Sequence, residues 1–353
     1  MTAEQRKPVS LALQGGGAHG AFTWGVLDRL LEDGRIDIAA ISGTSAGAMN
    51  AVVAAGGLMQ AGEDGARAAL AAFWKAVSDA ARLSPIQRNP IDVLLGNWSL
   101  DNSPGFRLFD GLSRVVSPYQ FNPLNLNPLR DLLVDQVDFD LVRSCDRMKV
   151  FVSATNVETG RVTVFDRRRL TADMVMASAC LPYIFQAVEI DGVPYWDGGY
   201  VGNPALFPLY PVRETADIVI VQINPVERPG TPDTAREILD RINEISFNSS
   251  LLAELRAIDF VHRLIESGQL TDNRYRYLHL HLIEDGAALN PLGASSKLNA
   301  EWAFLTHLRD LGRQAAGRWL DAHWRNLGRR STVDIRAMFQ GLRDGQAPPA
   351  AAG

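Results

Sequence analysis

The sequence predicts an α/β fold: a three-layer α/β/α domain with a central, mostly parallel sheet, followed by a C-terminal helical extension. Two strand–turn–helix units predict the sheet domain. In each unit an apolar, strand-like run leads through a glycine-rich turn into a helical pattern, first over residues 9–32 and again over residues 38–53. Units of this kind assemble into parallel sheets covered by helices. Apolar stripes at helical spacing after residue 225 predict the extension.

The first unit carries a glycine-rich loop between its strand and its helix. The run 9–13 is typical of a buried strand, the loop Gln14-Gly15-Gly16-Gly17-Ala18-His19-Gly20 follows it, and residues 21–32 have a helical pattern. Consecutive glycines leave backbone N–H groups exposed at the helix N-terminus, where such groups stabilise negative charge. The loop is therefore a candidate anion site.

Two interpretations of this loop compete. Gly15, Gly17 and Gly20 fit the dinucleotide fingerprint G-x-G-x-x-G, which needs the same strand–loop–helix setting. That fingerprint also expects an acidic residue at the end of the next strand, where this chain has Ser42-Gly43-Thr44-Ser45, with Asp37 at the wrong end. We therefore favour an oxyanion hole, whose N–H donors stabilise the oxygen that becomes negative when a nucleophile attacks a carbonyl.

The second unit carries the candidate nucleophile. The pentapeptide Gly43-Thr44-Ser45-Ala46-Gly47 lies between a short apolar run and an Ala-rich helix start, which is the context of a nucleophile elbow. The serine of so sharp a turn has a strained backbone, and Gly43 and Gly47 leave room for the neighbouring strand and helix. Ser45 is therefore predicted to stand at the helix N-terminus as the nucleophile.

A third segment supplies a candidate base. The run Tyr195-Trp196-Asp197-Gly198-Gly199-Tyr200 follows a strand-like segment and a turn. An aspartate before two glycines is by itself typical of a turn. Taken together, the three segments indicate one site, because the loops of an α/β sheet gather at the carboxyl ends of its strands.

Three blocks in this order resemble the patatin-like phospholipase family. They are the loop Gly15 to Gly20, the elbow Gly43 to Gly47 and the block Asp197-Gly198-Gly199. Two further stretches, Ala177 to Pro182 and Ser153 to Asn156, are similar to the family's approach to its aspartate and to its mid-domain strand. The resemblance covers about two thirds of the chain, from the first strand to the strand that ends near residue 225.

The resemblance implies a patatin-like fold and a Ser–Asp dyad instead of a Ser–His–Asp triad. In such a dyad Asp197 takes the proton from Ser45 directly, and the activity is hydrolysis of a lipid acyl ester, such as a phospholipid, through an acyl-Ser45 intermediate. A carboxylate with an ordinary pKa of about 4 is a poor base at neutral pH. Burial beside Tyr195 and Trp196 is expected to raise that pKa. The oxyanion donors it implies are Gly15, Gly16, Gly17 and Ala18, and the other motif positions are Gly20, Gly43, Gly47, Gly198 and Gly199.

One loop position differs from the resemblance, because the family commonly has Arg or Lys where this chain has His19. If that cation orders the loop or holds charge, His19 makes the contribution depend on pH. His19 also keeps the triad alternative open, since it is the histidine that its position ties to the site. His279 and His281 alternate on one face of a predicted strand, and we interpret them as a hydrogen-bonded structural pair.

Composition agrees with a soluble enzyme. The chain has 353 residues, of which 46% are hydrophobic, enough for one large domain or a domain with an appendage. A net charge of -5 gives no basic footprint for nucleic acid, and Arg167 to Arg169 reads as a solvated turn. Cys145 and Cys180 form no disulfide framework and suit a reducing compartment. No apolar run approaches the roughly 18 residues of a membrane span, so we expect a cytoplasmic protein with no cofactor and no metal site.

The segment 83–129 is predicted to be a long excursion. It is dense in Pro, Asn and Gly but still carries many apolar and aromatic residues, so we expect short helices whose apolar groups pack somewhere. Two interpretations are open: a packed elaboration of the core, or a lid over an acyl pocket.

After the last expected central strand, 219–223, the pattern becomes helical. One helix is predicted from about Thr234 to Ser267 and a second from about Leu298 to Asn326. The second carries tryptophans beside arginines, which is compatible with peripheral contact with a membrane, although a helix packed on its own domain is the favoured interpretation. The predicted parts are a tail at 1–8, the catalytic domain at 9–225, the extension at 226–345 and a disordered tail at 346–353.

The main function expected from this sequence is lipid acyl ester hydrolysis. Two alternatives stay open: an esterase acting on soluble esters or on an intracellular polyester, and a non-catalytic lipid-binding member of the fold. The sequence determines neither the lipid head group nor the oligomeric state.

Overall fold

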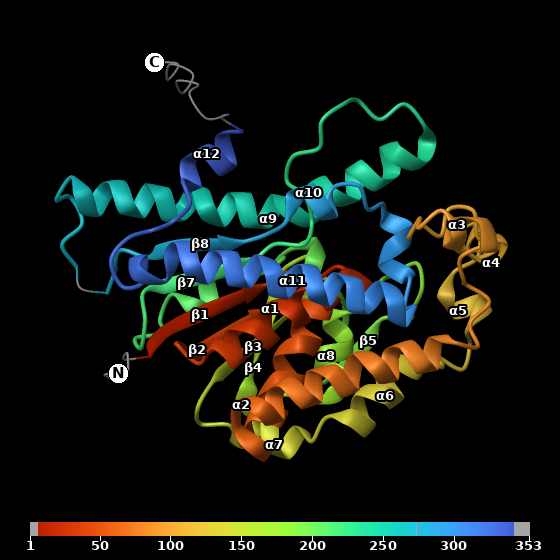
Figure 1. The fold of residues 1–353 in the computed structure, drawn as a ribbon, viewed down its shortest axis with the longest axis horizontal. Coiled ribbons are helices and arrows are strands. Elements are labelled where there is room, and N and C mark those ends of the chain that lie inside the picture. Colours follow the sequence, from red (N-terminus) through yellow and green to blue (C-terminus); the bar gives the residue numbers. More distant parts are fainter. Residues whose placement is uncertain (1–5, 273, 342–353) are drawn as a thin grey trace.

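The computed structural model describes residues 6–272 and 274–341. The predicted disordered tail at 346–353, and residues 1–5 of the predicted N-terminal tail, lie outside the described residues. One sheet crosses the middle of the molecule and has helices on both of its faces (Figure 1). The predicted α/β class, with three layers and a C-terminal helical region, is confirmed.

Within the described residues the sheet has eight strands, which are β1 (Lys7–Leu13), β2 (Ile36–Gly43), β3 (Lys149–Asn156), β4 (Val162–Asp166), β5 (Val188–Ile190), β6 (Val193–Asp197), β7 (Asp217–Val221) and β8 (His279–Ile283). Their order is β5-β6-β3-β2-β1-β7-β8, and β4 pairs with β3. Every pair among β3, β2, β1, β7 and β8 is parallel, whereas β4, β5 and β6 pair antiparallel. The parallel strands therefore end at one edge, where the predicted loops meet.

The α-helices are α1 (Gly20–Asp33), α2 (Ala46–Ala81), α3 (Pro90–Leu94), α4 (Pro104–Ser113), α5 (Pro118–Phe121), α6 (Pro128–Gln136), α7 (Phe139–Ser144), α8 (Ala172–Ser178), α9 (Ala235–Glu266), α10 (Gly286–Leu289), α11 (Trp302–His323) and α12 (Ile335–Gln340). Short 3₁₀ turns include η1 (Gly17–His19), η3 (Gly198–Tyr200) and η5 (Ala294–Leu298). The turn η1 contains the candidate loop residues Gly17, Ala18 and His19. The turn η3 follows Asp197 directly and contains Gly198 and Gly199.

Among the described residues, the two larger of three apolar clusters lie between the sheet and its helices. The larger lies against α1, α2 and α11 and contains the fully buried side chains of Phe22, Leu70 and Phe304. The smaller lies on the opposite face, where Leu251 and Leu255 of α9 pack against β7 and β8. Because strand β7 is apolar toward both cores, it has the continuous hydrophobic sequence of a strand covered on two sides.

Two of the predicted strand limits are wrong. Strand β1 begins at Lys7, inside the predicted tail, because Lys7 and Pro8 already pair in register with β2. The run predicted as the last central strand, 219–223, is β7, which begins earlier, at Asp217, and ends at Val221, and β8 pairs with it in parallel at the edge of the sheet. The region predicted to be mainly helical therefore also extends the central sheet. The alternation of His279 and His281 with leucines is that of a strand, as predicted.

The excursion at 83–129 contains α3, α4 and α5, each with a proline in its first turn. Leu100 and Phe106 are buried, and Trp98 stacks on Phe304 of α11 with ring centroids 5.1 Å apart. Its other large apolar side chains are mostly exposed, so the expectation that they pack is wrong. The exposed ones are Leu83, Ile91, Val93, Leu94, Leu95, Leu108, Leu112, Val115, Tyr119, Leu124 and Leu126.

The two long predicted helices are α9 and α11. Only the C-terminal half of α9 buries its apolar stripe, since Ile238, Leu239, Ile242 and Ile245 are exposed in the other half. On α11, Trp319 is only 5% exposed and lies edge-on to His281 at 5.9 Å. Trp319 therefore faces the domain, which favours the structural interpretation of this helix, whereas Trp302 at its start is 37% exposed. Within the described residues, no helix has the length and apolar character needed to cross a membrane.

Candidate functional site

Ser45 lies on a sharp turn between β2 and α2. Its backbone has φ 53° and ψ -121°, which is strained for a residue with a side chain. A Cβ on Gly43 would lie 2.6 Å from the carbonyl oxygen of Gly47, and a Cβ on Gly47 would collide with the carbonyl oxygen of Leu13. The N–H of Ser45 donates to Oγ of Ser178 at 2.8 Å. The turn thus requires both glycines and presents the serine at the start of α2.

The glycine-rich loop lies directly against this turn. Leu13 and Gly43 are paired where the parallel strands β1 and β2 end, so the segments that follow them leave the sheet side by side. A Cβ on Gly15 would lie 2.6 Å from the Cβ of Ser45. The loop and the nucleophile elbow therefore form one site.

The glycine-rich loop has backbone N–H groups that are not used in hydrogen bonds. Among the residues that the structure describes, the N–H groups of Gly16, Gly17 and Ala18 have no hydrogen-bond acceptor. The N–H of Gly15 donates to Oδ1 of Asn203 at 2.7 Å. The prediction that Gly15 donates to an oxyanion is therefore wrong, because its N–H is already used to anchor the loop.

Asp197 ends β6 next to the nucleophile elbow. Strand β6 pairs with the end of β3, which is the parallel neighbour of β2. The Oγ1 atom of Thr44, beside Ser45, lies 2.6 Å from Oγ of Ser153 and donates to the carbonyl oxygen of Gly202 at 2.6 Å. These bonds hold the segment that follows Asp197 against the elbow.

The carboxyl group of Asp197 is buried, with 1% of the residue exposed, and its Oδ1 accepts a hydrogen bond from the N–H of Gly199 at 2.7 Å. Burial raises the pKa of Asp197 to about 6, while the hydrogen bonds from Gly199 and from the Ser45 side chain, and the charge of Lys297, oppose the rise. A base with a pKa near the working pH accepts a proton more effectively than an ordinary aspartate. Ser45, Asp197 and the loop are thus brought together.

Comparison with known proteins bears on this arrangement. A family profile described as patatin-like phospholipase matches residues 11–210, more than half of the chain. The chain belongs to the patatin-like phospholipase family. The matched region contains the loop, the elbow and the Asp197 block, and the resemblance drawn from these blocks is confirmed. No curated protein sequence matches the chain.

Three solved structures are similar to this patatin-like chain. VipD from Legionella pneumophila has 16% identity and a TM-score of 0.43, and the match covers 91% of this chain and 67% of VipD. The type III effector ExoU has 14% identity and a TM-score of 0.35, covering 90% of this chain and 54% of ExoU. The ExoU–SpcU complex from Pseudomonas aeruginosa has 17% identity and a TM-score of 0.30, with 96% of this chain and 69% of the other covered.

His19 is buried in the loop of this patatin-like chain. Its Nε2 lies 2.8 Å from Oγ of Ser296, whose hydroxyl donates to the carbonyl oxygen of Gly293, so His19 is the donor. Burial, followed by the charge of Lys297, lowers the pKa of His19 to about 3. The prediction of a pH-dependent charge at His19 is therefore wrong, since the ring is neutral over the ordinary pH range. Its partner is Ser296 and not Ser45, which also leaves the triad alternative without support.

The histidine pair on β8 has a structural setting. Nε2 of His281 lies 2.9 Å from Oδ1 of Asp217, and its Nδ1 lies 3.0 Å from Oγ1 of Thr332. Asp217 is the first residue of β7, so the pair of His281 and Asp217 lies toward the amino ends of the strands, whereas Ser45 follows the carboxyl end of β2. Across the described ranges, no three His, Cys, Asp or Glu side chains are grouped so as to hold a metal ion.

A buried amide network under the loop was missed by sequence reasoning. Oε1 of Gln14 accepts hydrogen bonds from the N–H groups of Ile223 and Asn224, each at 2.9 Å. Nε2 of Gln14 donates to Asn248 at 3.1 Å, and Nδ2 of Asn224 donates to the carbonyl oxygen of Gly15 at 2.7 Å. The available signal was that Gln14 and Asn224 follow apolar strands, at the edge where functional loops gather.

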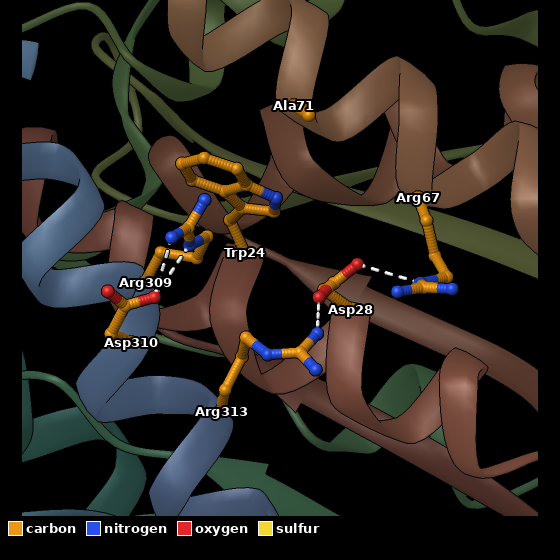
Figure 2. Close-up of a pocket in the computed structure, with 7 residues that line it drawn as sticks. All are labelled: Trp24, Asp28, Arg67, Ala71, Arg309, Asp310 and Arg313. Carbon is orange, nitrogen blue, oxygen red and sulfur yellow. Dashed lines mark hydrogen bonds and ion pairs between the residues drawn. The ribbon is translucent and has the colours of Figure 1, made fainter.

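A pocket between α1, α2 and α11 is separate from this site (Figure 2). Its volume is about 360 Å³, and its floor is occupied by Asp28, which is paired with Arg67 at 2.8 Å and also with Arg313. Arg309 lies over the ring of Trp24. None of the candidate site residues lines this pocket, and its ion pairs tie α11 to the family-matched region.

Proposed function

We propose that the protein is a serine hydrolase that cleaves the acyl ester bond of a lipid, such as a phospholipid, through an acyl-Ser45 intermediate. One observation carries the proposal: Ser45, on a strained turn at a helix N-terminus, has a buried Asp197 with a raised pKa on one side and a glycine loop with free N–H groups on the other. Membership of the patatin-like phospholipase family supports a lipid substrate.

In the first half-reaction the hydroxyl oxygen of Ser45 attacks the ester carbonyl carbon while Asp197 accepts the hydroxyl proton. The carbonyl oxygen becomes an oxyanion, which accepts hydrogen bonds from the loop N–H groups of Gly16, Gly17 and Ala18. The intermediate then expels the alcohol portion of the lipid, which leaves with the proton held by Asp197. The products of this half are the free alcohol and an ester between the acyl group and Ser45.

In the second half-reaction water attacks the acyl-Ser45 ester. Asp197 accepts a proton from that water, the same N–H groups hold the second oxyanion, and Ser45 leaves with the proton from Asp197. The fatty acid departs and the dyad is restored. Ser45, Asp197 and the loop N–H groups are the protein groups that contact the reacting atoms in both steps.

A direct test uses a small fluorophosphonate together with a substrate panel. We expect the fluorophosphonate to add one phosphonyl group, found on Ser45 by peptide mass spectrometry. The panel contains phosphatidylcholine, lysophosphatidylcholine, a triacylglycerol and p-nitrophenyl butyrate, and we expect turnover of at least one lipid above that of the butyrate ester. Turnover of the butyrate ester alone would favour the soluble-ester alternative. Absence of labelling and of all turnover would favour the non-catalytic lipid-binding alternative.

We propose further that a lipid surface meets the protein at an apolar rim, defined as the exposed side chains of 83–126 and of the N-terminal half of α9. The excursion contacts the surroundings of the site. Leu100 N–H donates to Oγ of Ser295 in η5, and Gln186, shortly before β6, donates to the carbonyl oxygen of Asn122 at 2.7 Å. An ion pair between Arg236 and Asp101 joins α9 to the same excursion.

A large group of exposed apolar side chains usually marks an interaction surface, and beside a lipid-cleaving site the partner that fits it is a lipid surface. The rim contains many exposed leucines and isoleucines, whose transfer into the acyl boundary of a bilayer is favourable. In this proposal the excursion at 83–129 remains the segment through which the acyl chain reaches the site. The rim replaces helix α11, whose Trp319 is buried against the domain, as the membrane-facing element.

Leu94→Ser combined with Leu95→Ser should lower hydrolysis of phosphatidylcholine vesicles roughly tenfold while leaving p-nitrophenyl butyrate turnover unchanged. Both side chains are exposed, at 86% and 74%, so their loss costs the fold little but removes apolar area from the interface. Phe260→Ser is the matched control, because Phe260 is 54% exposed on the other half of α9. An equal loss on both substrates, or an equal loss in the control, would refute the rim.

A further inference from the structure

We propose that Lys297, which lies outside the family-matched region, is a positioning residue of this site: it fixes the glycine-rich loop through Asn224 and acts electrostatically on Asp197. The inference rests on the proposed function, since it assigns a role within the same reaction. It means that the C-terminal region, beyond residue 210, completes the catalytic arrangement.

The turn η5 clamps the loop through three contacts. Nζ of Lys297 donates to Oδ1 of Asn224 at 2.7 Å, and Nδ2 of Asn224 donates to the carbonyl oxygen of Gly15 at 2.7 Å. The carbonyl oxygen of Lys297 lies over Gly17, where φ is +58° and a Cβ would collide with it. His19 donates to Ser296, the neighbour of Lys297.

These contacts determine where the loop's polar groups point. Because Nδ2 of Asn224 donates to the carbonyl oxygen of Gly15, the peptide group that carries the N–H of Gly16 is fixed in orientation. The close approach of η5 at Gly17 is possible only for a residue without a side chain, so loop and turn fit each other at this point. An oxyanion hole depends on donors that are fixed before the reaction, and Lys297 contributes to that fixing through Asn224.

Lys297 also brings a positive charge to the site that the loop itself does not have, because His19 is neutral. Its charge lowers the pKa of both Asp197 and His19. Burial lowers the pKa of Lys297, and the carboxylates of Glu244, Asp240 and Asp197 oppose this by favouring its charged form. In its charged form the lysine therefore helps to keep Asp197 ionised and ready to accept a proton.

Several other titratable groups face this pair from the surrounding elements. They are Arg228, Asp240, Glu244 and His19 beside Lys297, and Cys180 and Tyr200 around Asp197. Glu244 is paired with Arg228 at 2.6 Å, and burial raises the pKa of Asp240. Burial raises the pKa of Cys180 to about 12 and also raises that of Tyr200, so both stay neutral between pH 5 and pH 8. Over that range, Asp197 is the group next to Ser45 that titrates.

The test measures the rate at which a small fluorophosphonate labels Ser45 as a function of pH, which reports nucleophile activation independently of the lipid. In the native protein we expect the rate to fall with acid through a midpoint near pH 6, the pKa of Asp197. In Lys297→Met the midpoint should move up by about one pH unit, because an opposite charge is lost, and labelling at pH 6 should fall roughly fivefold. Lys297→Arg keeps the charge and should retain the native midpoint.

The controls separate this role from a structural one. Lys149→Met makes the same change at an exposed lysine paired with Glu214 at the start of β3, and it should leave the midpoint unchanged. An unchanged midpoint in a folded Lys297→Met protein, even with a lowered Tm, would overturn the proposal while the proposed hydrolase stands. If Lys297→Met does not fold, Lys297→Gln removes the charge but keeps a donor, and the same shift is required of it. A native protein that is not labelled at any pH would overturn the hydrolase itself.

Discussion

Asp197→Asn should lower acyl ester turnover by about 10³-fold or more while leaving the fold intact. The amide has the shape of the carboxyl group and can still accept the hydrogen bond from Gly199 through its oxygen, but it cannot take the proton of Ser45. Ser45→Ala should lose activity to a similar extent, because residues that act as one unit fail together. The measurement is kcat/KM on one lipid ester, with Tm recorded for each variant.

The same substitution should stabilise the folded protein above pH 6. Burial holds the pKa of Asp197 near 6 in the folded protein against an ordinary 3.8, so the folded state binds the proton more tightly than the unfolded state. Its contribution to stability is therefore present below pH 3.8 and is lost as pH rises through 6. At about 1.36 kcal/mol per pH unit this loss is roughly 3 kcal/mol, which Asp197→Asn avoids at pH 8. Urea unfolding at pH 8 and pH 4 measures the difference.

Asp217→Asn is the matched control for both effects. Asp217 is also buried in the sheet, but burial there is outweighed by hydrogen bonds from His281 and the N–H of Gly328, which lower its pKa. The Asp217 carboxylate therefore stabilises the folded state at pH 8. Asp217→Asn should destabilise the protein at that pH, while the base, Asp197, is still present. Near-full activity of Asp197→Asn, or loss of activity only in a histidine variant, would contradict the dyad.

The parts of the site that could be predicted are those encoded locally. The turn at Ser45, with glycine two residues before and after it, is encoded in five consecutive residues, and the block that begins at Asp197 is encoded in three. Strand–turn–helix order then places such segments at one edge of the sheet. For this reason the fold class and the grouping of Ser45, Asp197 and the loop follow from the sequence.

The parts that could not be predicted depend on contacts between distant segments. Nothing near Gly15 indicates that Asn203, 188 residues away, takes its N–H, and nothing near His19 indicates that Ser296 and burial keep its ring neutral. Lys297 lies in a region without any recognisable motif. Its role depends on η5 folding back onto the loop, which the chain achieves through the docking of α11 on α1.

The burial of α9 also could not be predicted from the sequence, because it depends on which distant segments lie beneath the helix. Ile238, Ile242 and Leu255 all belong to the run of apolar residues at spacings of three, four and seven, and such a run predicts burial. Only Leu255 has the sheet beneath it, since α9 extends beyond the sheet toward the excursion (Figure 1). Periodicity indicates which face is apolar, but the length of the neighbouring layer decides how much of that face is covered.

Gly17→Ala should lower kcat about 10²-fold with little change in KM. The left-handed φ of +58° is unfavourable for alanine, and the new methyl group would collide with the carbonyl oxygen of Lys297. The loop must then move, and the N–H groups of Gly16, Gly17 and Ala18 lose their alignment with an oxyanion that exists only in the transition state. Steady-state kinetics on p-nitrophenyl butyrate measures the split between kcat and KM.

Gly160→Ala separates the loss of alignment from the cost of the backbone conformation. Gly160 has φ +65° but nothing within 4 Å of a Cβ, so alanine there meets the same backbone strain without a collision. It should lower Tm slightly and leave kcat unchanged. In Gly17→Ala the slower fluorophosphonate labelling should keep its acid midpoint near pH 6, because the charges of Asp197 and Lys297 remain. A midpoint that moved as in Lys297→Met would mean that the loop acts through the base, and the free N–H groups would lose their assigned role.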